Sequence, residues 1–513
     1  RHSFPTRRSS DRFGDFDNDG WQDLFVTNGM VRDLANLDLI ARLRRADSPA
    51  QAVALVRHSP ALQEENRVFR NTGRLRFEDA TAAWGLSDFG VSFGAVASDL
   101  DGDGDPDLIY ANFDRPPRLY RYNRQANRVV VRLRSRGANP FAVGARLFAT
   151  TTAGRLSRRI TLSHGALSSS PAETYFGLGT DHEILRLEIC WPDGRIDVAG
   201  NLAANHRYTF QESAVVDAPT AALAAAPPPA APLFTDVTAR IGLGFAPRNL
   251  PFNEFEGQPL LPLRRQSLDA GLAFGDANND GTSDVYFTGG YGQPGQLYLG
   301  HADGTFTPDP RPQPWADRAA IHEIAPLWID GDAAGAPNLL VTSGGVEHTE
   351  GSPELADQLC LNDGSGGFHP APAGKFPVIR DNASVVVAAD FDHDGDLDLF
   401  LGGAVVSGKY PLAARSCLLE NRDGVFSPVA SEMAPALKTP GAVAAAIWSD
   451  ANNDGWPDLL VASEWGPIRL FLNHEGRAFE AVTLEPGRPT RTGWWNSIEA
   501  ADVNQDGRMD YIV

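Results

Sequence analysis

The chain has 513 residues, a formal net charge of −20 and three cysteines. This length is enough for several domains with large cores, and the acidic balance argues against a nucleic acid or an anionic membrane surface as the partner. Cys190, Cys360 and Cys417 match neither a disulfide framework nor a zinc-binding spacing. No apolar run reaches membrane-spanning length without an interrupting proline or charge.

The first residues are set apart from the rest. The stretch from His2 to Asp11 resembles the translation of a sequencing adapter, so residues 1–11 are expected to be non-native. The chain has no initiator Met and stops at Val513 inside an expected strand. We therefore interpret it as an internal fragment of a longer protein, in which a missing targeting signal carries no information.

An aspartate-rich nonapeptide, D-x-[DN]-x-D-G-x-x-D, recurs six times and is followed each time by an apolar run. Side-chain oxygens at positions 1, 3, 5 and 9, with the carbonyl of position 7, suit a hard cation that takes many oxygen ligands, and the glycine at position 6 permits a sharp turn. Calcium fits this set better than Mg²⁺, which prefers a small octahedral shell with retained waters. A solvated acidic turn is the alternative for one copy, but six copies with the same fixed positions favour metal binding.

The sequence thus predicts up to six calcium sites. A seventh copy, from Asp330 to Asn338, lacks the acid at position 5 and is expected to be metal-free. The predicted ligands are Asp15, Asp17, Asp19, Trp21 and Asp23; Asp99, Asp101, Asp103, Asp105 and Asp107; Asp276, Asn278, Asp280, Thr282 and Asp284; Asp390, Asp392, Asp394, Asp396 and Asp398; Asp450, Asn452, Asp454, Trp456 and Asp458; and Asp502, Asn504, Asp506, Arg508 and Asp510.

A second repeated pattern consists of two short apolar segments around an Asn/Asp/Gly turn, which predicts a β-hairpin. It occurs at 68–81 and begins again at Leu297, Leu359, Leu418 and Leu470. Each unit therefore has four antiparallel strands, with the aspartate loop between the first two. In the second half the loops start 52 to 60 residues apart. Tandem four-stranded units of about 50 residues are typical of β-propeller blades.

These patterns predict an all-β chain. We expect residues 12–126 to be the last two blades of a first propeller and residues 127–212 to form a separate small all-β domain without an aspartate loop. Residues 213–232 are rich in alanine and proline and are expected to be a semi-rigid linker. Residues 233–513 would then supply about five blades of a second propeller, whose ring is open.

The residues resemble a known family. The loops and lead-ins such as SFGAVASD resemble the FG-GAP/VCBS repeats of integrin-α-type propellers, and the stretch that begins NRVVVRLRSRGANPFAVGARL at Asn127 resembles an ASPIC/UnbV domain. Their order is similar to that in bacterial members of the cartilage acidic protein family. The resemblance implies calcium binding, adhesion-type interactions and an extracellular, cell-surface or periplasmic location.

Two enzyme motifs lack their usual context. Gly90–Gly94 reads G-x-S-x-G, but it leads into a strand and an aspartate loop rather than a strand–turn–helix. Gly403–Lys409 has the spacing of a phosphate-binding loop, but Tyr410 replaces the Ser or Thr that would bind Mg²⁺. The expected function is a non-catalytic binding or adhesion module for an extracellular protein or glycan, and its oligomeric state is open. The alternative is a propeller-based lyase or hydrolase that acts on polysaccharide.

Two surfaces are singled out for partners. From Arg115 to Ile160 there are twelve arginines and no acid. We expect a solvated strand face beside an acidic propeller, and the alternative is a site for anionic glycans or phosphates. The second surface is the face of the ring opposite the aspartate loops, where aromatic and charged residues indicate a ligand site unless the tryptophans cap the core. Its candidates are Arg264, Arg265, Lys409, Tyr410, Trp465, Trp494 and Trp495.

Overall fold

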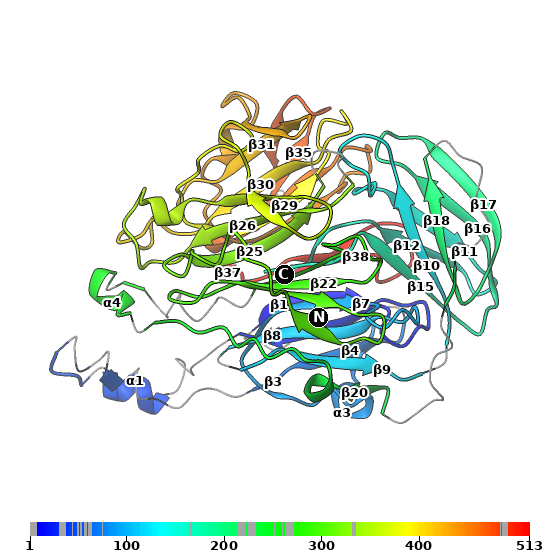
Figure 1. Cartoon of the computed structure of the whole chain (residues 1–513), viewed down its shortest axis with the longest axis horizontal. Helices are drawn as coiled ribbons and strands as arrows, with labels where there is room; N and C mark the ends of the chain where they lie inside the picture. The colour runs from blue at the N-terminus through cyan, green and yellow to red at the C-terminus, as the bar shows by residue number, and fades with distance from the viewer. Residues whose placement is uncertain are drawn as a thin grey trace.

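The computed structural model describes residues 8–513 except for 30–36, 44, 49–50, 52–53, 56–58, 60–63, 74, 114, 125, 165–166, 213–220, 224–231, 251, 259, 262–270, 331–334, 483 and 485–490. Regular structure in these residues is almost entirely β-strand, which confirms the predicted class. In Figure 1 the sheets of the larger part lie one above another, and a second, two-sheet domain (residues 127–211, the middle domain) lies at their right-hand side.

Outside the middle domain, the described residues contain seven successive antiparallel sheets of the ring, which we number blades 1 to 7. Blade 1 is β1 (Arg8–Gly14), β2 (Asp23–Asn28), β4 (Arg67–Asn71) and β5 (Phe77–Asp79); blade 2 is β7 (Ser92–Ser98), β8 (Asp107–Asn112), β9 (Arg118–Tyr122) and β20 (Phe234–Asp236); blade 3 is β21 (Leu272–Gly275), β22 (Asp284–Phe287), β23 (Gln296–Gly300) and β24 (Phe306–Pro308); blade 4 is β25 (His322–Ile329), β26 (Asn338–Gly344), β27 (Gln358–Asn362) and β28 (Phe368–Pro370).

Blade 5 is β29 (Ala383–Ala389), β30 (Asp398–Gly403), β31 (Cys417–Arg422) and β32 (Val425–Pro428); blade 6 is β33 (Ala442–Ser449), β34 (Asp458–Pro467), β35 (Arg469–Asn473) and β36 (Phe479–Val482), with β37 (Thr492–Trp494) paired to the end of β34; blade 7 is β38 (Glu499–Ala501) and β39 (Asp510–Ile512). Smaller elements are β3 (Glu64–Glu65), β6 (Phe89–Gly90), α1 (Leu37–Leu43), α3 (Thr81–Trp84), α4 (Glu254–Gly257), η1 (Thr238–Arg240), η2 (Pro353–Leu355) and η3 (Pro435–Leu437).

The innermost strands form a closed ring. They contact one another in the order β1, β7, β21, β25, β29 and β33, then β38, which returns to β1. Figure 1 accordingly draws the two chain ends close together. Inner and second strands are apolar on both faces because neighbouring blades cover both, and β25 and β26 are buried along their whole length. Outer strands such as β24 and β28 expose most of their residues, so the core lies between blades near the ring axis.

The predicted division into two propellers is wrong in this structure. Blade 2 takes its fourth strand from beyond the middle domain, because Phe234–Asp236 pairs antiparallel with Tyr120–Tyr122 of β9. The two expected blades and the five expected blades therefore belong to a single ring, which is closed rather than open. The physical reason is that a strand edge pairs with whatever complementary segment the fold brings to it, and the intervening residues can loop out as a domain.

The middle domain has two four-stranded sheets, and the apolar core between them is continuous with that of blades 4 and 5. One sheet has the order β15 (Glu173–Gly179), β10 (Asn127–Arg134), β18 (His206–Gln211) and β19 (Ala221–Ala222); the other has the order β12 (Arg155–Arg159), β11 (Arg146–Thr150), β16 (Glu183–Cys190) and β17 (Ile196–Ala203). Part of the predicted linker, Ala221–Ala222, is thus an edge strand, and most of the rest lies outside the described residues.

A hairpin of the middle domain, β13 (Ser163–His164) and β14 (Ser168–Ser169), enters the centre of the ring. β14 pairs in parallel with β21 of blade 3, and the hairpin also contacts β7, β25 and β29. The Leu272 N–H donates to the Leu167 carbonyl at 3.1 Å, and Leu167 packs against three separate core clusters of the ring and middle domain. The middle domain is therefore fixed to the ring axis as well as to its rim.

The adapter-like start of the chain also takes part in the fold. Residues 8–11, expected to be non-native, form the first half of β1 and pair with residues 26–28 of β2. The backbone N–H of Asp11 donates to the Ser497 hydroxyl at 3.1 Å, which links blade 1 to the segment before blade 7. These residues complete the inner strand of blade 1 whatever their origin.

Candidate metal sites and the opposite face of the ring

All six predicted loops share one internal geometry. In each, a carboxylate oxygen of the position-1 aspartate accepts the N–H of the glycine at position 6, at distances from 2.9 to 3.2 Å. The position-5 aspartate accepts the N–H of position 7 at 2.8 to 3.0 Å. These bonds curl the backbone around the side chains at positions 1, 3 and 5, which is the shape that a many-oxygen cation requires.

Two backbone positions in each loop are left-handed. Glycine at position 6 has φ from 84° to 97°, as the template predicts. Position 4 is left-handed too: Asn18, Asn279, His393, Asn453 and Gln505 have φ between 56° and 60°, and the remaining loop has Gly102 there. The predominance of Asn and Gly at this variable position is the sequence signal for it, because these residues enter the left-handed region most readily.

In blades 1 to 6, position 9 links the loop to the third strand of its blade. In blade 5 one oxygen of Asp398 accepts the N–H of Phe391 at 3.0 Å and the other accepts that of Asn421 at 2.8 Å, and the corresponding aspartate bonds a third-strand N–H in blades 1, 2, 3 and 6 as well. Blade 4 keeps the link with an amide, since Asn338 accepts the Asn362 N–H at 2.9 Å. Position 9, predicted as a metal ligand, also links the loop to its blade.

Within the described residues, three loops gather three or more acidic ligand atoms within 4.8 Å of one another. They are Asp15, Asp17 and Asp19; Asp99, Asp101 and Asp103; and Asp390, Asp392 and Asp398. In the loops at Asp276, Asp450 and Asp502 an asparagine takes position 3, and its amide donates to the position-5 aspartate at 2.8 to 3.0 Å. These three asparagine-containing loops therefore hold fewer carboxylates, and less negative charge, at positions 1, 3 and 5 than the loops at Asp15, Asp99 and Asp390.

Buried oxygens without a hydrogen-bond donor show that the donor set fits a cation. One oxygen each of Asp15, Asp17, Asp390 and Asp450 is buried and accepts no hydrogen bond, although the residue is part of a curled loop. Such oxygens are costly to desolvate unless something with positive charge meets them. A calcium ion bound through positions 1, 3 and 5 would supply that charge.

The pKa values of the loop aspartates indicate the same lack of a compensating positive charge. Burial raises the pKa of Asp390 to about 8, and the charges of Asp394 and Asp392 add to the effect. Burial likewise raises the pKa of Asp392 to about 6 and that of Asp15 to about 7. A divalent cation at the loop would favour the charged carboxylates and lower these pKa values.

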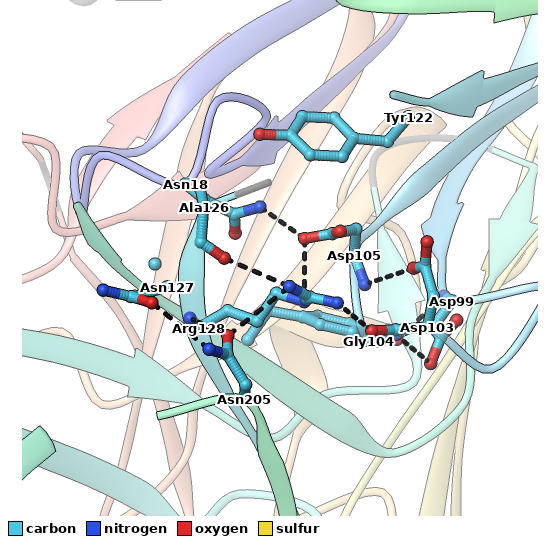
Figure 2. Close-up of polar contacts among 12 residues, drawn as sticks. Asn18, Asp99, Asp103, Gly104, Asp105, Tyr122, Ala126, Asn127, Arg128 and Asn205 are labelled. Carbon is cyan, nitrogen blue, oxygen red and sulfur yellow. Dashed lines mark hydrogen bonds and ion pairs between the residues drawn. The ribbon is translucent and has the colours of Figure 1, made fainter. Parts of the chain in front are cut away.

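The arginine-rich stretch is the expected solvated strand face only in part, since Arg134 and Arg136 are exposed whereas Arg128 is buried against an aspartate loop. Figure 2 shows Arg128 of the middle domain beneath the loop of blade 2, where its Nε is 2.9 Å from Asp105 Oδ1 and a second guanidinium nitrogen donates to the Asp103 carbonyl. Asn18 of the neighbouring loop donates to the same Asp105 oxygen at 2.7 Å. The buried Arg128 thus joins the loop of blade 2 to the middle domain, and Asp105 in turn links this loop to that of blade 1 through Asn18.

Further contacts join the middle domain to the loop of blade 2 and to the loops of blades 1, 6 and 7. Arg158 pairs with Asp15 at 3.3 Å, Arg146 pairs with Asp450 at 3.1 Å, and Arg207 pairs with Asp99 at 2.5 Å. The Ser157 hydroxyl donates to Asp502 at 2.6 Å. The middle domain therefore docks on the face of the ring that carries the aspartate loops, and charge complementarity holds it there.

The opposite face presents the aromatic residues that the sequence singled out. Trp465 is 56% exposed, has a left-handed φ of 56°, and donates its indole N–H to the hydroxyl of the buried Tyr410. The rings of Trp465 and Trp494 lie 4.8 Å apart at 46°. Trp495 instead donates to the Gly466 carbonyl at 2.9 Å and packs on the blade 6 core.

These aromatic residues form a partly exposed platform rather than a fully buried cap. Lys409 extends beside them and pairs with Glu350 at 2.5 Å. Arg264 and Arg265 lie outside the described residues. Five of the seven predicted ligand-face residues are thus described, and four of these, Lys409, Tyr410, Trp465 and Trp494, flank the same end of blades 5 and 6.

Family models identify both kinds of module. The ASPIC and UnbV model matches residues 135–217, and the FG-GAP-like repeat model matches residues 330–401 and 450–513. The chain carries an ASPIC/UnbV domain and FG-GAP-like repeats. The repeat matches fall on blades 4 to 7, and the ASPIC/UnbV match covers most of the middle domain.

A curated relative supports this assignment. Human cartilage acidic protein 1 is 34% identical to the chain over 159 residues, which is 29% of this chain. The match spans 23% of that protein's length, so its whole-protein properties do not transfer directly.

Solved structures show only distant likeness. An Agrocybe aegerita lectin that recognises non-reducing terminal N-acetylglucosamine aligns with a TM-score of 0.35 and 13% identity, over 75% of this chain and 88% of the lectin. The Vibrio cholerae biofilm matrix protein Bap1 aligns with a TM-score of 0.28 and 9% identity, over 99% of this chain and 84% of its own. In the part of the chain that the structure describes, no helix is both long and apolar enough to cross a membrane.

Sequence reasoning missed the contacts between the ASPIC/UnbV domain and the loops. The signal was present as complementary charge, with twelve arginines beside acidic repeats, but spacing alone does not reveal which arginine meets which loop. The fourth strand of blade 2 had a clearer signal. Residues 234–238 (FTDVT) repeat residues 77–81 (FEDAT), the fourth strand and following turn of blade 1.

Proposed function

We propose that this chain is a calcium-stabilised, non-catalytic binding or adhesion module that works outside the cytoplasm and binds a protein or glycan partner. FG-GAP-like repeats and an ASPIC/UnbV domain favour a repeat-based binding module, and the curled aspartate loops favour calcium as a structural ion. Weak loop affinities of about 10⁻⁴–10⁻³ M, typical of extracellular modules, would require a calcium-rich exported setting.

The observation that carries the partner site is the exposed Trp465 platform. The Trp465 indole is more than half exposed, and it is held by a left-handed backbone conformation and by a hydrogen bond to the buried Tyr410. A left-handed conformation at a residue other than glycine costs free energy, and such residues cluster at functional sites. The platform lies at the ring face opposite the ASPIC/UnbV domain, so a partner could reach it while that domain stays docked. Large, rigid aromatic side chains with polar neighbours are favoured at interaction sites.

The test uses the intact chain on glycan and protein arrays, with calcium and with EDTA. We expect calcium-dependent capture of a discrete partner, and we expect Trp465→Ala to abolish it while the calcium-dependent melting transition is unchanged. Phe376→Leu, a change in a partly buried ring that packs on another blade interface, is the matched control and should bind normally. Undiminished capture by Trp465→Ala would place the site elsewhere, and cleavage of an arrayed polysaccharide would favour the lyase or hydrolase alternative.

A further inference from the structure

The third strand of each four-stranded blade has one residue at an equivalent register position next to its aspartate loop. This third-strand loop residue comes immediately before the residue whose N–H binds the position-9 side chain. The register places Arg70 in blade 1, Arg121 in blade 2, Leu299 in blade 3, Leu361 in blade 4, Glu420 in blade 5 and Leu472 in blade 6 at this point. The same geometric position therefore carries a cation, an apolar group or an anion.

In blades 1 and 2 this residue neutralises the loop. The Nε of Arg70 lies 2.7 Å from Asp17 Oδ2, and its Nη2 lies 2.8 Å from Asp19 Oδ2. Arg121 pairs in the same way with Asp101. These acids are the position-3 and position-5 ligands that calcium would use, and the ASPIC/UnbV domain adds Arg158, Arg207 and Arg128 to the same two loops.

In blade 5 the same position adds charge of the opposite sign. Glu420 takes the third-strand loop position here, directly before Asn421, so the five aspartates from Asp390 to Asp398 meet a carboxylate at this position instead of a guanidinium. Arg422 pairs with Glu420, which compensates that carboxylate and keeps the guanidinium off the loop; in the described part of the chain, no ion pair joins a basic side chain to the aspartates of this loop. Asp390 is buried and, among the described residues, one of its oxygens has no hydrogen-bond donor; a carboxylate oxygen of Asp390 lies within 4.8 Å of ligand oxygens of Asp392 and Asp398.

We propose that the third-strand loop residue sets the calcium affinity of each loop, with the loop of blade 5 the tightest site and the loops of blades 1 and 2 the weakest. Calcium affinity in oxygen-ligand loops rises with the number of uncompensated carboxylates, and a guanidinium next to a divalent cation repels it. The inference rests on the proposed calcium binding. It adds that the loops under the ASPIC/UnbV domain are largely neutralised by arginine, so the domain stays docked when calcium is scarce.

The experiment is isothermal titration calorimetry of the full, EDTA-stripped chain with CaCl₂. Asp392→Asn should remove the tightest site, and Glu420→Leu should weaken it about ten-fold, whereas Asp17→Asn should leave it intact. Arg70→Leu with Arg121→Leu should tighten the weakest sites about ten-fold. Arg67→Leu, which removes a charge from the same strand as Arg70 but pairs with Asp79 away from the loop, is the matched control and should change nothing.

The outcomes separate this inference from the proposed function. If the unmodified chain binds no calcium, both are overturned. If it binds calcium but Glu420→Leu leaves the tightest site unchanged, or Asp17→Asn removes that site, the inference alone is overturned. Glu420→Gln, which keeps the side-chain shape, covers the case in which Glu420→Leu does not fold, and it should also weaken the tightest site.

Discussion

Arg158 of the ASPIC/UnbV domain and Asp15 of blade 1 form a buried ion pair at 3.3 Å, with side chains 5% and 1% exposed. The guanidinium also donates to the Tyr175 and Ser157 carbonyls, so its position is fixed from its own domain. The backbone N–H of Gly177 donates to the same oxygen of Asp15 at 3.1 Å. One carboxylate of an aspartate loop is thus a shared acceptor for two strands of another domain.

Removal of Arg158 should strongly destabilise the chain. Arg158→Ala leaves Asp15 buried without its cation, and the loss of one partner of a buried pair costs about 3–5 kcal/mol. Urea denaturation monitored by tryptophan fluorescence should show this loss as a lower midpoint. Arg186→Ala, which breaks an exposed pair with Glu188, should cost about 1 kcal/mol or less. Equal losses in the two variants would contradict the docking role of Arg158.

Calcium removal should lower the melting temperature. Each occupied loop stabilises the folded state by mass action, by about 2.7 kcal/mol when calcium is at one hundred times the dissociation constant. Without the ion, the carboxylates of a loop such as that at Asp390 repel one another. Differential scanning calorimetry with CaCl₂ and with EDTA measures the shift, and MgCl₂ is the matched control. A melting temperature that EDTA does not change would exclude a structural role for calcium.

Acidification should weaken the chain through His164. Burial is the main cause that lowers the pKa of His164 from the ordinary value of 6.5 to about 4, and the positive charge of Arg12 lowers it further. Glu499 acts in the opposite direction. The unfolded chain therefore binds this proton at a higher pH than the folded chain does. The contribution of His164 to the free energy of unfolding is fully present above about pH 6.5. It is lost as the pH falls towards 4, and amounts to about 3 kcal/mol.

The contribution of His164 is measured as a difference. Urea midpoints of the unmodified chain and of His164→Gln should converge as the pH falls from 7 to 4.5, because the variant lacks the titrating group. The aspartates of the loops titrate in both proteins and cancel. A constant difference between the two midpoints across this range would show that His164 does not charge on unfolding.

Position 4 of a loop should accept glycine but not a β-branched residue. Asn279 has φ of 57°, a region that glycine enters freely and valine avoids. Asn279→Gly should leave stability nearly unchanged, whereas Asn279→Val should cost about 1–3 kcal/mol. Thermal denaturation in EDTA separates this backbone effect from metal binding. Similar stabilities for the two variants would mean that the loop can relax away from the left-handed conformation.

The sequence predicted the parts that depend on local pattern. The aspartate loops, the hairpins and the all-β class follow from residue spacing, because a turn such as Asp390–Asp398 needs its glycine and its acids at fixed positions. The pairing of Phe234–Asp236 with β9 joins segments more than one hundred residues apart, and no local period encodes it. The arginine contacts were missed for a related reason, since Arg128 and Asp105 meet only after two domains have docked.

Because β20 belongs to blade 2, the linker does not separate two parts of the chain that are stable independently of each other. The ASPIC/UnbV domain is inserted within a single sheet, between β9 and β20, while its hairpin lies at the ring axis. A protease that cut the alanine- and proline-rich segment would sever the covalent connection but release nothing, because both halves would stay joined by strand pairing across blade 2 and by the contact of β38 with β1. The nicked protein would co-migrate as one particle under native conditions and separate only in denaturant.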